Sequence, residues 1–313
     1  MPADLKLLIR KLALFFLPFA LYGLVIAAID PYDYFEGPSF FSEESKRPVS
    51  LPLNYALWKM LEFRDAPAPN LLLGDSRMMS VKTETIREVA GLDYANLAYG
   101  GGSLREAIDT FWFADGLVPL ERVCIGVNLN NYSAYDNKDR VSEAAAILDN
   151  PFLYLVNLNV LNAAVKLVKA GLTGEPARIG KPVGSREQFW RRQIEVVARE
   201  MYANYSYPAV HHANLVEVSE YCRDHGIELV FLVFPSHRDL QDQVAAFDLG
   251  AAQERMLADL AELGTVFDFE LANEITADRE NYTDPFHFEP DVMRKIVAGV
   301  WNGDRQFVKV YGQ

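Results

Sequence analysis

Two short segments of this 313-residue chain carry side chains that together could break or form an ester bond. A serine hydroxyl is a weak nucleophile until a base removes its proton, and that base needs a carboxylate to hold its tautomer and stabilise its charged form. Ser76 lies in a Gly-Asp-Ser segment, and Asp284 precedes His287 by three residues near the C-terminal end. These residue types, in this order, predict a nucleophile, an orienting acid and a general base.

Acyl transfer also requires donors for the oxyanion that forms when a carbonyl is attacked, and one well-placed donor contributes roughly 3–4 kcal/mol. The glycines at 100–102 can bring backbone N–H groups close to a ligand because glycine has no Cβ atom. Asn128 adds a side-chain amide at the end of an apolar run. Simpler interpretations stay open: a tight turn for the glycines, a loop cap for Asn128 and a helix N-cap for Ser76.

These segments require a scaffold that brings them together, and the pattern around them predicts one. From residue 70 onward, short apolar runs alternate with helical patterns of about a dozen residues, which is typical of an α/β fold with a doubly wound parallel sheet. Ligands of such sheets bind beyond the carboxyl ends of the strands, where the candidate segments fall. The predicted strands are 70–74, 93–97, 122–129, 227–234 and 265–269, and the predicted helices are 81–90, 104–116, 210–225, 251–263 and 290–301.

Taken in order, the motifs resemble those of the SGNH (GDSL-like) hydrolase superfamily. Gly-Asp-Ser at 74–76 resembles its nucleophile block, and Asn-x-Ala-x-x-Gly at 96–101 resembles its glycine block. Gly-Val-Asn at 126–128 resembles its Gly-x-Asn block, and Asp-x-x-His at 284–287 resembles its final block. The resemblance covers roughly residues 70–301 and implies a flavodoxin-like, three-layer fold. One departure is Leu129, where the family often has an aspartate.

The resemblance also implies a role for each matching residue. Ser76 is then the nucleophile, His287 the base and Asp284 its orienting acid. The backbone of Ser76 and Gly101 and the side-chain amide of Asn128 form the oxyanion hole. This chemistry requires no cofactor and no metal.

Two further residues are candidates for substrate binding. Arg77 follows the predicted nucleophile and could bind an anionic substrate, or it could form a structural ion pair with a carboxylate. His237 follows the most apolar predicted strand, so it is expected at the ligand-binding edge. It could contact substrate there or be an ordinary loop histidine.

The first thirty residues predict a membrane helix. No residue from 12 to 29 is charged, and about 18 helical residues at 1.5 Å each span about 27 Å, close to the thickness of the hydrocarbon core. Basic residues precede this run and acidic residues follow it, which predicts a cytoplasmic N-terminus and an extracytoplasmic remainder. We expect an uncleaved signal anchor. The alternatives are a signal peptide cleaved near 26–28 and a buried helix of a soluble protein.

Three parts are therefore expected along the chain. Residues 1–30 form a cytoplasmic stub and a transmembrane signal anchor, and residues 31–69 form an extracytoplasmic lead-in with a short helix near 53–63. Residues 70–313 form the SGNH-like catalytic domain. A helical insertion at about 150–208, with a Gly/Pro-containing linker at 171–184, either covers the site or faces the membrane.

The overall composition excludes several classes of function. The net charge is −13, from 30 basic and 43 acidic residues, and no basic run offsets it, so nucleic acid is not expected as a partner. Half of the residues are apolar, which allows a sizeable core. The two cysteines, Cys124 and Cys222, are too few for a disulfide scaffold or a multi-cysteine metal site, and we expect buried free thiols.

An N-terminal membrane helix ahead of such a domain is similar to the extracytoplasmic SGNH-like proteins that acylate or deacylate cell-surface polymers. The DltD proteins of teichoic acid D-alanylation and the alginate O-acetylation proteins are examples. The resemblance implies a membrane-anchored serine O-acyltransferase or esterase acting on O-acyl, chiefly O-acetyl, groups of a polysaccharide. An acylated carbohydrate would be the substrate, and an integral membrane acyltransferase would be a partner. The alternative is a non-catalytic binding or assembly protein with the same fold.

Overall fold

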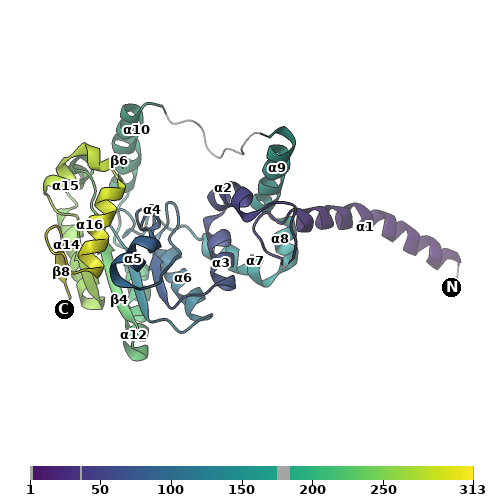
Figure 1. The fold of residues 1–313 in the computed structure, drawn as a ribbon, viewed down its shortest axis with the longest axis horizontal. Coiled ribbons are helices and arrows are strands. Elements are labelled where there is room, and N and C mark those ends of the chain that lie inside the picture. Colours follow the sequence, from purple (N-terminus) through teal and green to yellow (C-terminus); the bar gives the residue numbers. More distant parts are fainter. Residues whose placement is uncertain (1–2, 36, 175–183, 313) are drawn as a thin grey trace. The chain divides into compact units, whose positions relative to one another are not determined.

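The structure is a computed structural model that describes residues 3–35, 37–174 and 184–312 (Figure 1). Most of the predicted linker at 171–184 therefore lies outside the described residues. The chain divides into two compact units. The helical unit comprises Met1–Glu62 and Glu143–Gly180, and the sheet unit comprises Phe63–Ser142 and Lys181–Gln313.

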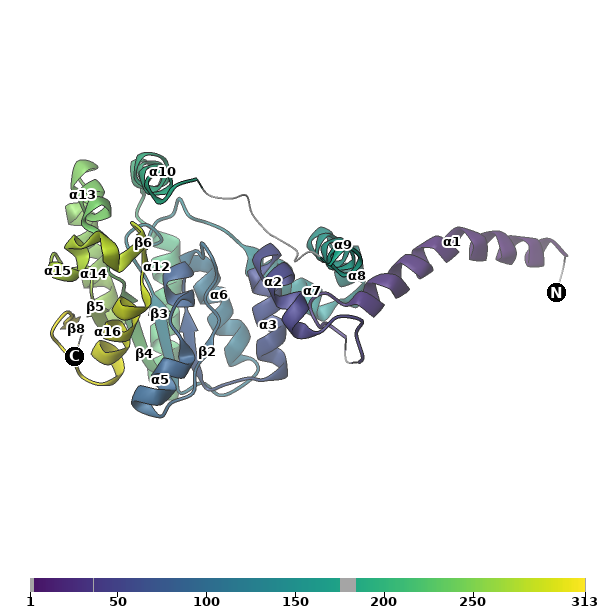
Figure 2. The ribbon, with the colours of Figure 1, turned by 45° about the horizontal axis from the view of Figure 1, so that its top comes forward.

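A six-stranded sheet organises the sheet unit, with the strand order β2-β1-β3-β4-β5-β8 (Figure 2). The first five strands in this order run parallel, and β8 pairs antiparallel with β5 at the edge. All five predicted strands are present, each somewhat shorter than expected, which confirms the α/β class and the parallel sheet. The strands are β1 (Asn70–Leu73), β2 (Ala95–Asn96), β3 (Arg122–Gly126), β4 (Glu228–Val233), β5 (Thr265–Asp268) and β8 (Lys309–Tyr311).

Helices cover both faces of this sheet. Along β1, Leu71 and Leu73 join one hydrophobic cluster and Leu72 joins another, because successive side chains of a strand point to opposite faces. A strand buried on both faces reads as an unbroken apolar run, as this one does. The longest helices of the first cluster are α6 (Leu104–Asp115), α12 (Ala209–His225) and α14 (Gly250–Leu263), and those of the second are α5 (Thr83–Ala90) and α16 (Pro290–Trp301).

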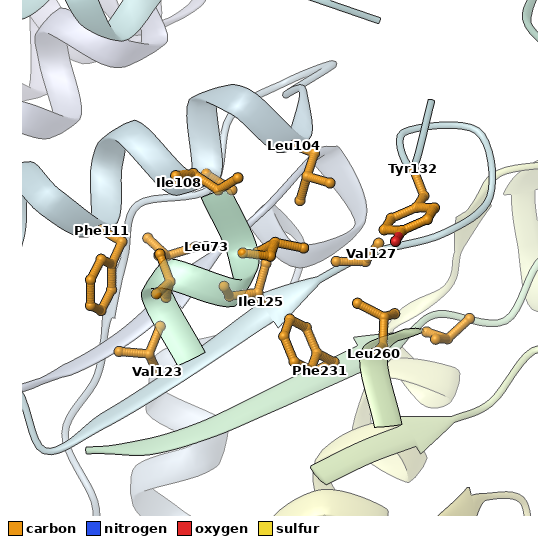
Figure 3. Close-up of a cluster of buried hydrophobic side chains, with 14 of the residues drawn as sticks. Leu73, Leu104, Ile108, Phe111, Val123, Ile125, Val127, Tyr132, Phe231 and Leu260 are labelled. Atoms are coloured by element: carbon orange, nitrogen blue, oxygen red, sulfur yellow. The ribbon is translucent and has the colours of Figure 1, made fainter. Parts of the chain in front are cut away.

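The first cluster forms a continuous core between the sheet and its helices (Figure 3). Ile125 of β3 and Phe231 of β4 are fully buried in it, as is Phe111 of α6. Full burial of one such side chain contributes roughly 1.5–3 kcal/mol, so this core holds α6 and its preceding loop firmly against the sheet.

Shorter elements connect these layers in the sheet unit. Within the helical insertion expected at 150–208, residues 186–203 form a continuous helical stretch with a π-helical centre. The short elements are α4 (Ser76–Met79), α10 (Arg186–Arg192), η1 (Gln193–Ala198), α11 (Arg199–Ala203), α13 (Arg238–Ala246), α15 (Glu274–Ala277), η2 (Arg279–Asn281), β6 (Tyr282–Asp284) and β7 (His287–Phe288).

Every regular element that the structure describes in the helical unit is a helix. Its α9 packs on α2, with Val160, Ala164 and Leu167 of α9 buried, and the Tyr154 hydroxyl of α8 donates a 2.6 Å hydrogen bond to Asp30. Two of the helices, α3 and α7, each contain a chain boundary between the two units. The helices are α1 (Ala3–Ile29), α2 (Glu43–Leu53), α3 (Tyr55–Asp65), α7 (Arg140–Asp149), α8 (Pro151–Val156) and α9 (Leu158–Thr173).

This division differs from the expected boundaries at 30, 69 and 150–208. The described residues of 31–62 group with those of 143–174 instead of forming a separate lead-in, while residues 184–208 belong to the sheet unit. The physical reason is long-range packing: α2 and α9 are far apart along the chain, so no local pattern in either of them predicts their contact. The helix expected near 53–63 is present as α3, but α2, which contains Pro48 and Pro52, was not predicted.

Helix α1 is long and apolar enough to cross a membrane over the stretch Asp4–Ile29. Most of its large apolar side chains are exposed, with Phe15 at 63% and Leu24 at 67%. A helix of this length and composition near an N-terminus also occurs as a signal sequence.

Candidate active site

The predicted nucleophile lies where β1 turns into α4. Gly74 adopts φ = 140°, a conformation that side-chain-bearing residues rarely take, and a Cβ atom there would lie 2.9 Å from the Gly126 carbonyl oxygen. Asp75 caps α4 by accepting a hydrogen bond from the Arg77 N–H. The chain thus turns sharply after the buried strand and leaves Ser76 partly exposed.

The strand order gives this turn a particular position. In the order β2-β1-β3, the chain passes from β1 to β2 on one side of β1 and then crosses back to β3 on its other side. The point between β1 and β3 is therefore where the winding of the sheet reverses. Such switch points open a crevice beyond the carboxyl ends of the strands, where ligands bind in sheets of this kind. Ser76 follows β1 directly, and Asn128 follows β3 by two residues.

Asp284 and His287 lie on a small β-hairpin. They pair across the antiparallel strands β6 and β7, with Pro285 and Phe286 in the turn. The backbone N–H groups of Phe286 and His287 donate to Asp284 Oδ1 at 2.9 and 3.2 Å. The spacing of three residues thus brings the two side chains together through a tight hairpin turn.

The three side chains form a continuous hydrogen-bonded chain. Ser76 Oγ lies 2.7 Å from His287 Nε2, and His287 Nδ1 lies 2.8 and 2.9 Å from the two carboxylate oxygens of Asp284. Asp284 is buried, whereas the His287 side chain retains 33% exposure. In this arrangement the partly exposed imidazole can carry a proton between the serine hydroxyl and a bound molecule, while the buried acid stabilises its charged form.

Several contacts hold the hairpin in place. The His237 N–H donates to the Pro285 carbonyl at 3.0 Å, at the hairpin turn. Arg186 of α10 donates to the Tyr282 carbonyl at 2.8 Å, and the rings of Phe234 and Phe288 stack with centroids 5.6 Å apart. Helix α10 therefore supports the hairpin that carries Asp284 and His287.

The loop that holds the glycines at 100–102 packs against the backbone of the turn at 74–76, which carries Ser76. The Tyr99 N–H donates to the Gly74 carbonyl at 3.0 Å, and a Cβ atom at Gly102 would lie 2.6 Å from the same oxygen. Arg140 donates to the Gly100 carbonyl at 3.1 Å from outside the loop. Gly101 adopts φ = 60°, and its N–H makes no hydrogen bond to any residue that the structure describes.

Asn128 is engaged by the backbone of the neighbouring strand. Its Nδ2 donates to the Phe234 carbonyl at 2.8 Å, and its Oδ1 accepts from the Phe234 N–H at 3.1 Å. Its own N–H donates to Asn131 Oδ1 at 2.7 Å. One Nδ2 hydrogen is therefore used to link the ends of β3 and β4, and the second is left for any role in an oxyanion hole, which stays a prediction.

Arg77 forms an ion pair behind the nucleophile. It is 2% exposed, and its Nε donates to Asp75 Oδ2 at 3.0 Å while its Nη2 donates to Asn130 Oδ1 at 2.9 Å. Burial alone would lower the pKa of Arg77, but the Asp75 carboxylate outweighs burial and raises it. The geometry corresponds to the structural alternative for Arg77, because its guanidinium is directed away from solvent and toward Asp75.

His237 is buried in an aromatic cluster. It caps α13 by accepting a hydrogen bond from the Asp239 N–H, and its ring lies edge-on to Trp190 and Tyr282 at 4.9 and 5.6 Å. Burial lowers the pKa of this imidazole. The side chain therefore packs between α10 and the hairpin, and its contact with substrate stays a prediction.

Glu270 was not singled out in the sequence, although it follows β5 at the same edge of the sheet. Its carboxylate accepts hydrogen bonds from the backbone N–H and the hydroxyl of Ser236. It also lines a small cavity with Arg77 and Asn128. Burial raises the pKa of Glu270 to about 7. Its position after the last parallel strand was the only signal available, and many structural residues share it.

The cysteines lie away from this chemistry. Cys124 on β3 and Cys222 on α12 are buried and free, as predicted. Burial raises the pKa of each thiol to about 12, so neither supplies a thiolate nucleophile near neutral pH.

Comparison with known proteins adds little to this geometry. No protein-family model matches the sequence, and no curated protein matches it. Among solved structures, the fold is similar to the crystal structure of a "putative acylhydrolase" from Bacteroides fragilis NCTC 9343, at 10% identity and a TM-score of 0.35. The superposition covers 77% of this chain and 93% of that chain. A likeness at this level carries no argument about activity.

Proposed function

We propose that this protein is a serine acyl-transfer enzyme that forms an acyl-enzyme on Ser76. The observation that carries the proposal is the hydrogen-bonded chain from Ser76 through His287 to Asp284, with distances of 2.7 and 2.8 Å. A serine that only capped α4 would not need an imidazole from a hairpin 211 positions away at its hydroxyl. The proposal includes membership of the SGNH-type hydrolases, which the four sequence motifs support.

In the first half of the reaction, His287 Nε2 takes the proton of Ser76 as Oγ attacks the ester carbonyl. A bond forms from Oγ to the carbonyl carbon, and the carbonyl electron pair moves to its oxygen. When this intermediate collapses, the ester C–O bond breaks and the leaving alcohol takes the proton from His287. Asp284 stabilises the imidazolium in between.

In the second half, an acceptor hydroxyl gives its proton to His287 and attacks the acyl-enzyme. The Ser76 oxygen leaves and takes that proton back. Water as the acceptor makes the enzyme an esterase, and a sugar hydroxyl makes it an acyltransferase. The N–H groups of Ser76 and Gly101 and the second Nδ2 hydrogen of Asn128 are proposed as donors to the oxyanion.

The proposed substrate is an O-acylated, chiefly O-acetylated, cell-surface polysaccharide, and α1 is proposed to anchor the enzyme with its catalytic part outside the cytoplasmic membrane. Support for the anchor comes from the uncharged run at 12–29 and the change from basic to acidic flanks. An integral membrane acyltransferase is the proposed partner. Protease added to spheroplasts should digest everything beyond α1, and protection of that part would exclude this orientation.

The catalytic proposal is tested with the full chain in detergent. A fluorophosphonate should label the wild type at Ser76, and Ser76→Ala should lose both the label and the hydrolysis of an aryl acetate. Ser80→Ala is a matched control, because Ser80 lies one turn further along and its hydroxyl bonds the Ser76 carbonyl. A wild type that neither labels nor turns over would instead support a non-catalytic binding or assembly protein.

A further inference from the structure

A polar groove, separate from the catalytic hairpin, lies in the sheet unit between α6 and α12. Its volume is about 550 Å³, within the range of small-molecule sites. Two of its lining residues, Asp109 and His211, each have a buried atom, Oδ2 and Nδ1, that lacks a hydrogen-bond partner among the described residues. The polar lining residues are Arg105, Asp109, Asn137, Tyr207, His211 and Asn214.

Unpaired buried polar atoms are uncommon in folded proteins because each costs about 1–3 kcal/mol. His211 is only 8% exposed, and it lines the groove together with Asp109. Asp109 Oδ2 lies 3.5 Å from Arg105 Nε, an ion-pair distance that forms no hydrogen bond. The wall of the groove therefore holds polar groups whose hydrogen-bonding capacity the described residues leave unused.

The groove lies at the same edge of the sheet as Ser76. Helix α6 begins at Leu104, directly after the glycine loop, so Arg105 and Asp109 are on its first two turns. Helix α12 leads back to the start of β4, so its first turn, with His211, also lies at the carboxyl edge. A long substrate chain held at Ser76 could extend along this edge into the groove.

The charges around the groove select the class of ligand. Arg105 lies 3.5 Å from Asp109 Oδ2 and 2.7 Å from Asp139 Oδ2, so its charge is already shared between two carboxylates. An anion would meet these carboxylates, and Arg105, the one Lys or Arg among the described lining residues, already pairs with them. Sugar hydroxyls both donate and accept, so they can satisfy a carboxylate oxygen, an imidazole nitrogen and the neighbouring amides.

We propose that the groove binds uncharged sugar units of a carbohydrate chain. This inference rests on the proposed function in one respect: the bound chain would be the polymer whose acyl groups react at Ser76. The units bound beside Ser76 are then neutral sugars, and a polyanion is excluded from the groove.

The test is binding to an array of neutral and anionic oligosaccharides, with the full chain carrying Ser76→Ala so that nothing is turned over. Neutral oligosaccharides should bind, and Asp109→Ala or His211→Ala should weaken binding at least tenfold while the melting temperature shows that the variant is folded. Asp115→Asn, on the last turn of α6 and outside the groove, should bind normally.

Three results would overturn the proposal: no binding to any glycan on the array, preference for anionic glycans, or equal binding by all variants. The first would mean that water alone fills the groove. Fluorophosphonate labelling of Ser76 is independent of these outcomes, so the acyl-transfer proposal and the groove proposal can fail separately.

A second, independent observation concerns the helical unit. Helix α9 carries an apolar stripe on its exposed side, at the 3- and 4-residue spacing that places side chains on one face of a helix. Leu158 is 78% exposed and Leu172 is 83% exposed. The stripe consists of Leu158, Leu161, Val165, Val168 and Leu172.

The position of α8 relative to α1 indicates what covers this stripe. The Tyr22 hydroxyl donates to the Leu155 carbonyl of α8 at 2.9 Å, and α9 also packs against α1. Tyr22 lies eight residues before Asp30, or about 12 Å along the helix, inside the uncharged run. If α1 spans a membrane, α8 therefore lies at the depth of the outer leaflet.

The exposed apolar side chains continue from α9 onto α8, where Phe152 is 66% exposed and Val156 is 49% exposed. Lys166 and Lys169 flank the stripe and can reach lipid headgroups. From this geometry we infer that α8 and the α9 stripe lie in the outer leaflet, beside α1, as an in-plane membrane anchor. This inference rests on the membrane span of α1.

The full chain in proteoliposomes tests this inference. Single cysteines at Val165 and Leu172 carry an environment-sensitive fluorophore, and a cysteine at Glu88, an exposed position of α5 in the sheet unit, is the control. Spin-labelled lipids should quench the fluorophore at 165 and 172, and aqueous iodide should quench it at 88. Quenching of 165 and 172 by iodide, or by neither reagent as in a protein interface, would overturn the inference.

Discussion

Ser76 and His287 are 211 positions apart in the chain, yet the Oγ of one lies 2.7 Å from the Nε2 of the other. The first follows the strand at the switch point of the sheet, and the second is held by a hairpin anchored to the end of β4. This contact makes the Ser76 hydroxyl a candidate nucleophile instead of a simple helix cap.

If the two residues act as one unit, removing either should cost as much as removing both. Ser76→Ala, His287→Ala and the double variant should all lose roughly 10⁴–10⁶-fold in kcat for an aryl acetate. The measurement is kcat for the three folded variants. Additive losses would show that the two side chains do not share one step.

Asp284→Asn should retain the fold and lose about 10⁴-fold in kcat. The asparagine Oδ1 can still accept the N–H groups of Phe286 and His287, so the hairpin remains. The asparagine NH2 group cannot accept a hydrogen bond from the His287 Nδ1–H as the carboxylate oxygen does, and the tautomer of His287 changes as a result. The melting temperature is the control, and normal activity in a folded variant would contradict the assignment.

Asn128→Ala tests the predicted oxyanion donor against a purely structural link. The variant leaves the buried N–H and carbonyl of Phe234 unpaired, so we expect a loss of roughly 2–4 kcal/mol in the free energy of unfolding. If the second Nδ2 hydrogen reaches the oxyanion, kcat falls by about 10²–10³-fold as well.

Asn131→Ala is the matched control for this pair of effects, because Asn131 Oδ1 accepts from the Asn128 N–H at 2.7 Å and Asn131 is not one of the proposed oxyanion donors. We expect it to lower stability and to leave kcat within tenfold. Equal kcat losses in both variants would remove Asn128 from the oxyanion hole.

Gly102→Ala should disturb the nucleophile turn. The new Cβ atom would lie 2.6 Å from the Gly74 carbonyl, so the backbone must shift at a cost of about 1–3 kcal/mol. We expect reduced stability and reduced kcat. Gly116→Ala, where the nearest atoms lie at 3.5 Å, is the control and should behave as the wild type.

Arg77→Leu should destabilise the sheet unit by about 3–5 kcal/mol, because it leaves the buried Asp75 carboxylate without its cation. The double variant with Asp75→Asn should be more stable than Arg77→Leu alone, since asparagine can cap α4 without a charge. Unfolding by denaturant measures both. A double variant less stable than the single one would contradict a buried ion pair.

Glu270 should give stability a characteristic pH dependence. Its pKa is raised to about 7 in the folded protein, so the folded state binds the proton more tightly than the unfolded chain does. The resulting stabilisation is present below the unfolded pKa and is lost as the pH rises through 7, by at most about 3 kcal/mol. The stability of the wild type relative to Glu270→Gln should therefore fall between pH 5 and 8, and a flat difference would contradict the raised pKa.

Local sequence patterns predicted most strands and helices of the sheet unit. Apolar runs and helical periodicity predicted five parallel strands in their correct places, because each pattern reflects a face that the element itself must bury. The motif order also brought Ser76, Asp284 and His287 together as candidates. The uncharged run at 12–29 predicted the apolar helix α1 for the same local reason.

The tertiary structure decided what depends on contacts between distant segments. No periodicity predicts that α2 packs on α9, that the Asn128 amide pairs with Phe234, or that Arg77 turns inward to Asp75. A side chain's partners are chosen by the free energy of the whole fold, in which burial and hydrogen bonding across many residues compete. Residue types therefore limited the chemistry to serine, histidine and aspartate, and only folding placed their atoms within 3 Å of one another.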